Sequence, residues 1–316
     1  MIATGPRRRP PAGLSHEAYL YRTTEEFVTG TAAFLRAGLR AGDAALVSVP
    51  GARHDRLREA LGPAAAQVQF ADMTRVGRNP ARIIPFVHRF AQTHAGARVS
   101  FVGEPIWPGR TAAETRECVR HEALLNLAFS SADITIFCPY DAARLDEDTI
   151  ADSWRTHPLV CRHDGWWDSE DYTDPAVLYT AADRPLPAPP PSALLLRFRG
   201  EDLPLIRSLV GDAAARFGID ADRAADFVVA VNEIATNTVG HAPPVGLLRL
   251  WTDPRHEALV CEIRDSGHIT DPLAGRRMPA PDASTGRGLW LANQYCDLVE
   301  LRSGPDGTTI RLYGRR

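Results

Sequence analysis

The sequence predicts two domains of different fold class, an α/β domain followed by an α+β domain. In residues 14–178, short apolar strands alternate with helix-length segments, which is the order of a mainly parallel sheet. In residues 194–316, two long helices precede alternating, paired strands, which is typical of helices packed on one face of a mixed sheet. Five prolines within residues 183–192 favour an extended spacer, so we expect a linker over residues 179–193.

The composition excludes several classes of function. All 36 basic residues are arginines, and a phosphate-binding P-loop or a Schiff base needs a lysine. The net charge of −3 argues against a basic nucleic-acid-binding surface, and no apolar run approaches the roughly 20 residues that cross a bilayer. The arginines near the N-terminus are not followed by the apolar stretch of a secretory signal. We therefore expect a cytoplasmic protein without direct nucleic-acid or membrane contact.

The expected elements follow from the spacing of apolar residues. In the first domain, helices are predicted over residues 24–38, 80–94 and 111–128, and strands over residues 44–49, 68–71, 97–102 and 134–138. In the second domain, a strand over 194–198 precedes helices over 204–217 and from the capping residue Asp220 to about Val239. Strands follow over 246–252 and 258–264, and a hairpin joins 297–302 to 308–312 through the turn 303–307.

The five cysteines contain no C-x-x-C pair, so we expect buried thiols rather than a disulfide framework. His157, Cys161 and His163 are close enough in sequence to be considered as zinc ligands. A fourth ligand with suitable spacing is missing, which disfavours a zinc site there.

The second long helix of the C-terminal domain carries an E-x-x-x-N pattern. Glu233 and Asn237 lie four residues apart, so they project from the same side of the helix, away from most of its apolar stripe. A carboxamide oxygen can ligate Mg²⁺ on a nucleotide, and a carboxylate can orient or deprotonate an attacking hydroxyl. Taken alone, the pair is better explained by a solvent-exposed helix face.

Two later segments favour a nucleotide site. A predicted strand ends in Asp265-Ser-Gly267, where the carboxylate could accept a hydrogen bond from an adenine amino group and the glycine lets the backbone approach the base. Gly286-Arg287-Gly288-Leu289 opens a predicted helix, whose first backbone amides can bind phosphate.

In this order, the motifs resemble those of the GHKL (Bergerat-fold) ATPases, and in particular the RsbW-type anti-sigma kinases, in which E-x-x-x-N is followed by H-A as in VNEIATNTVGHA. The resemblance implies an α+β sandwich that binds ATP and Mg²⁺. It assigns Glu233 as general base, Asn237 as Mg²⁺ ligand, Asp265 and Gly267 as the adenine contact, and Gly286, Arg287, Gly288 and Leu289 as the phosphate loop. Thr309 is preferred over Thr308 as the threonine supporting the adenine pocket.

The C-terminal domain departs from the family pattern at one position. The family's D-x-G-x-G box has Ile269 in place of its second glycine, and the following lid, residues 271–285, is short and contains proline. The substitution restricts the backbone where the lid begins, which puts nucleotide turnover in question. His241, after the nucleotide helix, is expected to pack or to contact phosphate rather than to be phosphorylated.

Segments of the N-terminal half resemble the MEDS sensory domain, whose sheet looks like a RecA-type sheet without a P-loop. They are residues 21–39, the stretch FVGEPIW at 101–107, HEALLN at 121–126, CPYD at 138–141, and His157-Pro158. Open α/β sheets bind ligands at the carboxyl ends of their strands. The candidate sensor pocket therefore comprises Glu104, Trp107, His121, Glu122, Asn126, Tyr140 and Asp141.

A MEDS domain joined to an RsbW-like domain resembles the RsbA family of anti-sigma regulators. The resemblance implies an anti-sigma factor with serine/threonine kinase activity toward an anti-anti-sigma (STAS-type) antagonist, under the control of a small-molecule signal, and by analogy a homodimer. The alternative is a partner switch that holds a sigma factor or antagonist without turnover. A DNA-binding regulator is disfavoured because no helix-turn-helix segment or long basic stretch is present.

Overall fold

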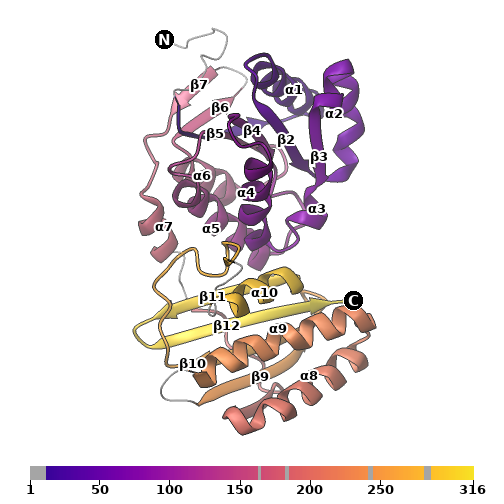
Figure 1. Ribbon diagram of the computed structural model, residues 1–316, viewed down its shortest axis with the longest axis vertical. Helices are drawn as coiled ribbons and strands as arrows, with labels where there is room; N and C mark the ends of the chain where they lie inside the picture. The colour runs from indigo at the N-terminus through magenta and orange to yellow at the C-terminus, as the bar shows by residue number, and fades with distance from the viewer. Residues whose placement is uncertain (1–11, 163–164, 182–184, 241–244, 281–285) are drawn as a thin grey trace. The chain divides into compact units, whose positions relative to one another are not determined.

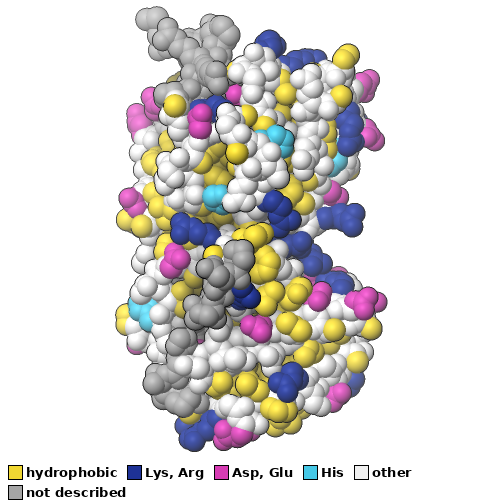
Figure 2. All heavy atoms as spheres, in the orientation of Figure 1, with side chains coloured by type: hydrophobic (Ala, Val, Ile, Leu, Met, Phe, Trp, Pro, Cys, Tyr) yellow, Lys and Arg dark blue, Asp and Glu magenta, His cyan; other side chains and the backbone are white. Residues whose placement is uncertain are grey.

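The computed structural model describes residues 12–162, 165–181, 185–240, 245–280 and 286–316. The chain divides into two compact units, residues 1–180 and 181–316 (Figure 1). Charged side chains of both signs are scattered over the visible surface (Figure 2), in line with the small net charge.

The N-terminal unit is built on a seven-stranded sheet with the order β3-β2-β4-β5-β1-β6-β7. All neighbouring strands are parallel except β6 and β7. The strands are β1 (Leu14–Tyr21), β2 (Ala44–Val49), β3 (Val68–Asp72), β4 (Val99–Gly103), β5 (Ile134–Asp141), β6 (Leu159–Arg162) and β7 (Gly165–Asp168). The expected mainly parallel α/β sheet is confirmed.

Helices join these strands. They are α1 (Thr24–Arg40), α2 (His54–Leu61), α3 (Met73–Val76), α4 (Ile83–Thr93), α5 (Ala112–Ala128), α6 (Glu147–Thr156) and α7 (Pro175–Ala181), with 3₁₀ turns η1 (Gly51–Arg53), η2 (Gly62–Gln67) and η3 (Pro80–Arg82). Side-chain caps define several helix starts: the Thr23 side chain accepts a hydrogen bond from the Glu26 amide, and Thr111 and Glu114 form a capping box at α5.

The central strand β1 was not among the predicted strands. It lies between β5 and β6, and its sequence LSHEAYLY buries His16 and Glu17 together with its apolar residues. Strand alternation sends Tyr19 and Tyr21 into the core that α1 and α2 form with the sheet, whereas His16 and Ala18 lie on the opposite face. Buried polar residues in a central strand interrupt the pattern of apolar residues from which strands are predicted. This explains why the spacing of apolar residues did not predict β1.

The C-terminal unit is a five-stranded sheet with the order β11-β12-β10-β9-β8. Its strands are β8 (Leu194–Phe198), β9 (Gly246–Asp253), β10 (Ala258–Asp265), β11 (Leu298–Gly304) and β12 (Gly307–Arg315), and its helices are α8 (Leu203–Phe217), α9 (Ala221–Gly240) and α10 (Arg287–Tyr295), with the 3₁₀ turn η4 (Gly200–Asp202). Each pair of neighbouring strands is antiparallel, so the sheet of the described residues is antiparallel rather than mixed.

The three helices and the sheet share one apolar core. Phe227, Val231 and Ile234 on α9 belong to the same buried cluster as Ile263 on β10 and Ile310 on β12. Alternate residues of a strand point to the same face of the sheet. Asp265 is two positions after Ile263, and Thr308 is two positions before Ile310, so both lie on the helix-covered face as well. The core therefore positions α9 beside the end of β10, where the D-x-G motif lies.

No helix within the described residues combines the length and the apolar character that crossing a membrane requires. The five cysteines are unpaired thiols, as expected, and four of them are buried.

We predict that Gly307→Ala destabilises the C-terminal unit by about 1–3 kcal/mol. Gly307 has a φ of +112°, and a Cβ there would lie 2.2 Å from the backbone oxygen of Asp265. Urea unfolding and hydrogen exchange of β10 and β12 would measure the loss.

Gly304→Ala, at the other end of the same turn, is the matched control. A Cβ at this position meets no atom of the described residues within 4 Å. Equal destabilisation by both substitutions would contradict the argument.

Candidate functional site

Helix α9 and the start of α10 bring the E-x-x-x-N and G-x-G motifs together. A Cβ at position 288 would lie 2.7 Å from Asn237 Nδ2 and 3.2 Å from Glu233 Oε2. The Gly288 backbone therefore packs directly on the two polar side chains. Asn237 is exposed and Glu233 is half-buried, so both can be reached from solvent.

The phosphate-loop motif has the backbone geometry of a helix start. Gly286 is the N-cap of α10 with a φ of +83°, in the left-handed region that glycine adopts without strain. Arg287 is exposed, and Gly288 and Leu289 are buried against the rest of the unit. The first amides of a helix lack intrahelical partners and carry the positive end of its dipole, which suits an anion.

The D-x-G motif forms a hydrogen-bonded turn beside α9. Asp265 Oδ2 accepts a hydrogen bond from Thr238 Oγ1 at 2.7 Å, and Oδ1 accepts one from the Gly267 amide at 2.8 Å. Thr308 Oγ1 donates to the Gly267 carbonyl at 2.8 Å. Asp265 is thereby held in place by two donors, with Thr238 on the helix that also carries Glu233.

Thr308, rather than Thr309, supports this turn. Thr308 lies opposite Asp265 in the β10–β12 register, whereas Thr309 lies opposite Arg264 and therefore points to the other face of the sheet. This corrects the choice between the two threonines, which sequence alone cannot make without the register of the hairpin. His241 lies outside the described residues.

Ile269 occupies the position of the missing glycine without backbone strain. Among the described non-glycine residues, only Glu257 has a positive φ, so Ile269 has an ordinary conformation. Its amide donates to Ser303 Oγ at 2.7 Å, and its side chain packs on the apolar core. The beginning of the lid is therefore held by a hydrogen bond to β11 and by packing on the core, and it does not use a glycine conformation.

The first part of the lid is also tied to α10. Gly275 has a φ of +70°, and its carbonyl accepts a hydrogen bond from Asn293 Nδ2 at 3.0 Å. A Cβ at Gly275 would come within 2.5 Å of Leu289 Cγ. Residue Leu289 of the phosphate-loop motif thus contacts the lid.

These contacts make a site with the functional groups that a Mg²⁺-nucleotide needs. It combines a carboxylate and a carboxamide on one helix face, a glycine whose backbone packs against them, a helix N-terminus and an oriented aspartate. Sequence reasoning missed Thr238 and Ser303. Thr238 follows Asn237 directly, and only the packing of α9 against the end of β10 reveals its role.

Five of the seven residues predicted to line a sensor pocket in the N-terminal unit lie in or against two buried polar clusters. Glu104 and Asp141 belong to the first, and Glu122 and Asn126 to the second, which also contacts Tyr140. Trp107 stacks under the Arg110 guanidinium at 3.8 Å, and His121 is buried. A cavity of about 840 Å³ in this unit is lined by other residues, including Glu26, Trp154 and Arg162.

The first cluster surrounds Glu104. Its Oε1 lies 2.8 Å from Arg53 Nη1 and accepts a hydrogen bond from the Tyr21 hydroxyl at 2.9 Å. Arg53 also lies 3.9 Å from Asp141 and stacks on Phe27. Burial raises the pKa of Glu104 to about 8, although Arg53 and the Tyr21 hydroxyl act in the opposite direction.

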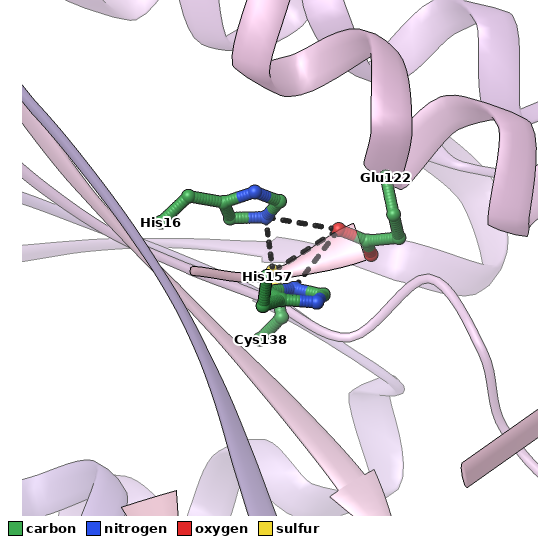
Figure 3. A group of neighbouring side chains, drawn as sticks. All are labelled: His16, Glu122, Cys138 and His157. Atoms are coloured by element: carbon green, nitrogen blue, oxygen red, sulfur yellow. Dashed lines mark hydrogen bonds and ion pairs between the residues drawn. The ribbon is translucent and has the colours of Figure 1, made fainter. Parts of the chain in front are cut away.

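The second cluster joins Glu122 to His16, Cys138 and His157 (Figure 3). Glu122 Oε2 lies 3.1 Å from His16 Nε2 and 3.4 Å from His157 Nε2. Burial lowers the pKa of His16, as does His157, and burial raises the pKa of the Cys138 thiol well above its usual value.

Sequence reasoning missed His16 because it lies in the unpredicted strand β1. It grouped His157 with Cys161 and His163, but the structure places His157 next to Glu122 instead. Cys161 lies on β6, and His163 is outside the described residues.

Comparison with known proteins identifies both domains. Residues 15–158 match the family model of the MEDS domain, the methanogen/methylotroph, DcmR sensory domain. Residues 196–313 match the model of the histidine kinase-like ATPase domain. The chain therefore carries an N-terminal MEDS domain and a C-terminal histidine kinase-like ATPase domain.

Two curated relatives share sequence with this chain. They are the anti-sigma-F factors RsbW of two Mycobacterium tuberculosis strains, CDC 1551/Oshkosh and ATCC 25618/H37Rv, each 41% identical over 76 residues. The match spans 24% of this chain and 45% of each relative. A crystal structure of RsbU and RsbW domains from Mycobacterium tuberculosis aligns with 66% of this chain and 49% of its own, at 16% identity and a TM-score of 0.29.

We predict that Gly288→Ala weakens ATP binding at least about tenfold, equivalent to about 1.4 kcal/mol. The added methyl group would displace the Asn237 carboxamide and press on Glu233. Isothermal titration calorimetry with Mg-ATP would measure the dissociation constant. Gly211→Ala on α8 is the control, since its Cβ would make an ordinary 3.7 Å contact with Val228. Unchanged affinity in Gly288→Ala would contradict the assigned contact.

We also predict that the contribution of Glu104 to the stability of the MEDS domain declines as pH rises from about 5 to about 8. Because the folded-state pKa of Glu104 lies above its ordinary value of 4.5, folding takes up a proton within this window, and the resulting stabilisation disappears as pH approaches 8. Urea unfolding at several pH values should show a smaller decline in Glu104→Gln. Glu25→Gln, at an exposed position of α1, should retain the full decline. An equally steep decline in Glu104→Gln would refute the assignment.

Proposed function

We propose that this chain, which joins a MEDS domain to a histidine kinase-like ATPase domain, is an anti-sigma factor with ATP-dependent serine/threonine kinase activity. The substrate would be an anti-anti-sigma antagonist of the STAS type, and the sequestered partner a sigma factor. The names of the two RsbW relatives, which are anti-sigma factors, support this assignment. We place the protein in the cytoplasm, where such partners act.

The single observation that carries the proposal is the contact of Gly288 with Glu233 and Asn237. It brings together two motifs that lie about 50 residues apart, and it places the backbone at the start of α10 directly against a carboxylate and a carboxamide, an approach that only glycine allows. A solvent-exposed helix face would not need a glycine from another helix packed upon it.

The residues of the site have distinct proposed roles. When bound, Mg-ATP would supply the phosphoryl group that is transferred to the substrate hydroxyl. Asn237 would ligate the Mg²⁺, the first amides of α10 would bind phosphate oxygens, and Asp265 would accept a hydrogen bond from the adenine amino group. Glu233 would orient the substrate hydroxyl and accept its proton.

The alternative function is a partner switch that binds a sigma factor or antagonist without turning over ATP. It was considered because Ile269 replaces the second glycine of the D-x-G-x-G box. The ordinary backbone of Ile269 and its packing on the core leave the polar groups of the site in place, which favours the kinase. Regulation by a small molecule at the MEDS domain and assembly into a homodimer remain part of the proposal.

We predict that Glu233→Ala lowers the rate of phosphate transfer by about 10²-fold or more while nucleotide binding persists. The substitution removes the proton acceptor but leaves Asn237 and the α10 amides. Transfer of labelled γ-phosphate from ATP to a cognate STAS-type antagonist would be measured, with nucleotide affinity followed by calorimetry.

Asn232→Ala is the matched control on the same helix. Asn232 accepts a hydrogen bond from Arg207 of α8 at 3.0 Å and so lies away from the phosphate loop. It should retain transfer, whereas Asn237→Ala should lose Mg²⁺-dependent binding. Undiminished transfer in Glu233→Ala would refute its role as base, and absence of nucleotide binding to the wild-type chain would leave only the non-catalytic alternative.

A further inference from the structure

We propose that His16, Glu122, Cys138 and His157 form a binding site for a divalent cation of the zinc class (Figure 3). All four side chains are buried, and one donor atom of each lies within 4.8 Å of those of the other three. Imidazole, carboxylate and thiolate donors are the ligands that zinc takes in proteins. The site lies within the MEDS domain, and the inference does not depend on the kinase proposal.

The fold brings these residues together from distant parts of the sequence. Strands β1 and β5 are parallel neighbours with His16 opposite Ile136 and Ala18 opposite Cys138, so His16 and Cys138 lie on one face of the sheet. Glu122 on α5 reaches this face, and His157 directly follows α6.

Four of the six distances between the donor atoms are close to those of a tetrahedral site, and the other two are no longer than 4.8 Å. Glu122 Oε2 is 3.1 Å from His16 Nε2 and 3.4 Å from His157 Nε2, and Cys138 Sγ is 3.5 Å from both Glu122 Oε2 and His16 Nε2. Metal–ligand bonds of about 2.0–2.3 Å in a tetrahedron place donor atoms about 3.3–3.8 Å apart. The side chains would need only small shifts to bind an ion.

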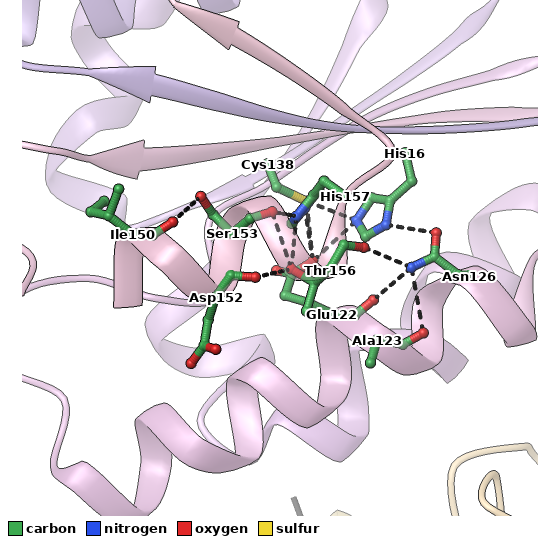
Figure 4. A network of polar contacts seen from close by, with 10 residues as sticks. All are labelled: His16, Glu122, Ala123, Asn126, Cys138, Ile150, Asp152, Ser153, Thr156 and His157. Atoms are coloured by element: carbon green, nitrogen blue, oxygen red, sulfur yellow. Dashed lines mark hydrogen bonds and ion pairs between the residues drawn. The ribbon is translucent and has the colours of Figure 1, made fainter. Parts of the chain in front are cut away.

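The surrounding hydrogen bonds orient both imidazole rings toward the centre (Figure 4). His16 Nδ1 lies 3.1 Å from Asn126 Oδ1, and the Asn126 amide group donates to the Thr156 carbonyl at 2.9 Å, which fixes its oxygen toward His16. His157 Nδ1 lies 2.9 Å from the Ser153 carbonyl. Both Nδ1 atoms therefore donate, so Nε2 of each ring is the atom directed at the cluster, as in metal-ligating histidines.

The charges also favour a cation. Two imidazole lone pairs and a carboxylate oxygen that converge in a buried place repel one another unless a proton or a cation lies between them. Within the described residues, Glu122 Oε1 is a buried atom without a hydrogen-bond partner, and His157 Nε2 has only the 3.4 Å contact with Glu122 Oε2. A divalent ion would neutralise the carboxylate and a Cys138 thiolate, with release of the thiol proton to solvent.

Four protein ligands leave no open coordination position, so the ion would join β1, β5, α5 and the segment after α6 instead of catalysing hydrolysis. Metal occupancy would then be coupled to the folding and conformation of the MEDS domain.

The test uses the untagged full-length chain expressed in zinc-supplemented medium. Elemental analysis should find about one zinc ion per chain, and Cys138→Ser or His157→Ala should lose it. Cys118→Ser is the matched control, because Cys118 is an equally buried thiol of the same domain that donates to the Pro105 carbonyl at 3.3 Å. This variant should keep the ion.

A second measurement uses cobalt in the wild-type chain, so its outcome does not depend on whether a variant folds. The wild-type chain loaded with Co²⁺ should show the visible bands of a tetrahedral site and a thiolate-to-metal charge-transfer band, and removal of the metal by a chelator should lower the melting temperature of the MEDS domain. A folded wild-type chain that binds neither zinc nor cobalt stoichiometrically would overturn the proposal. Metal binding that survives in folded Cys138→Ser and His157→Ala variants would also overturn it.

Discussion

The packing of the α10 N-terminus onto the polar face of α9 is the contact on which the proposed nucleotide site depends. Because position 288 is glycine, the α10 backbone can lie directly against Glu233 and Asn237. The same two helices share the apolar core of the sheet, with Leu289 and Ile234 in one buried cluster. The forces that fold the domain thus also set the distance between the carboxylate, the carboxamide and the α10 amides that we propose bind phosphate.

The MEDS domain uses buried polar groups in a different way. Its sheet places Glu104 beside Arg53 and Tyr21 on one face, and His16 beside Cys138 on the other. Such groups are costly to bury, so each must be satisfied by a partner, a proton or an ion. A signal that changes protonation or metal occupancy would therefore act on the core of the domain, not on an open surface pocket.

The predictability of the two domains differed for a physical reason. In the C-terminal domain, apolar periodicity and turn residues predicted the helices and strands, and the spacing of Glu233 and Asn237 indicated one helix face. In the N-terminal domain, His16 and Glu17 interrupt the apolar pattern of the central strand, so β1 could not be identified. Its absence from the predicted elements hid the second polar cluster, although Glu122 and Asn126 had been selected as candidates.

The sequence by itself determined the two fold classes, the exclusion of a P-loop and the order of the nucleotide-site motifs, because these depend on residue type and on spacing within single elements. Only the tertiary structure decided which threonine of β12 meets the D-x-G turn, since this depends on the register with β10. Only the tertiary structure showed that the backbone at Ile269 does not adopt a positive φ, and that His157 contacts Glu122 instead of Cys161. Contacts between segments far apart in sequence leave no periodic signal, so they become visible only when the chain is folded.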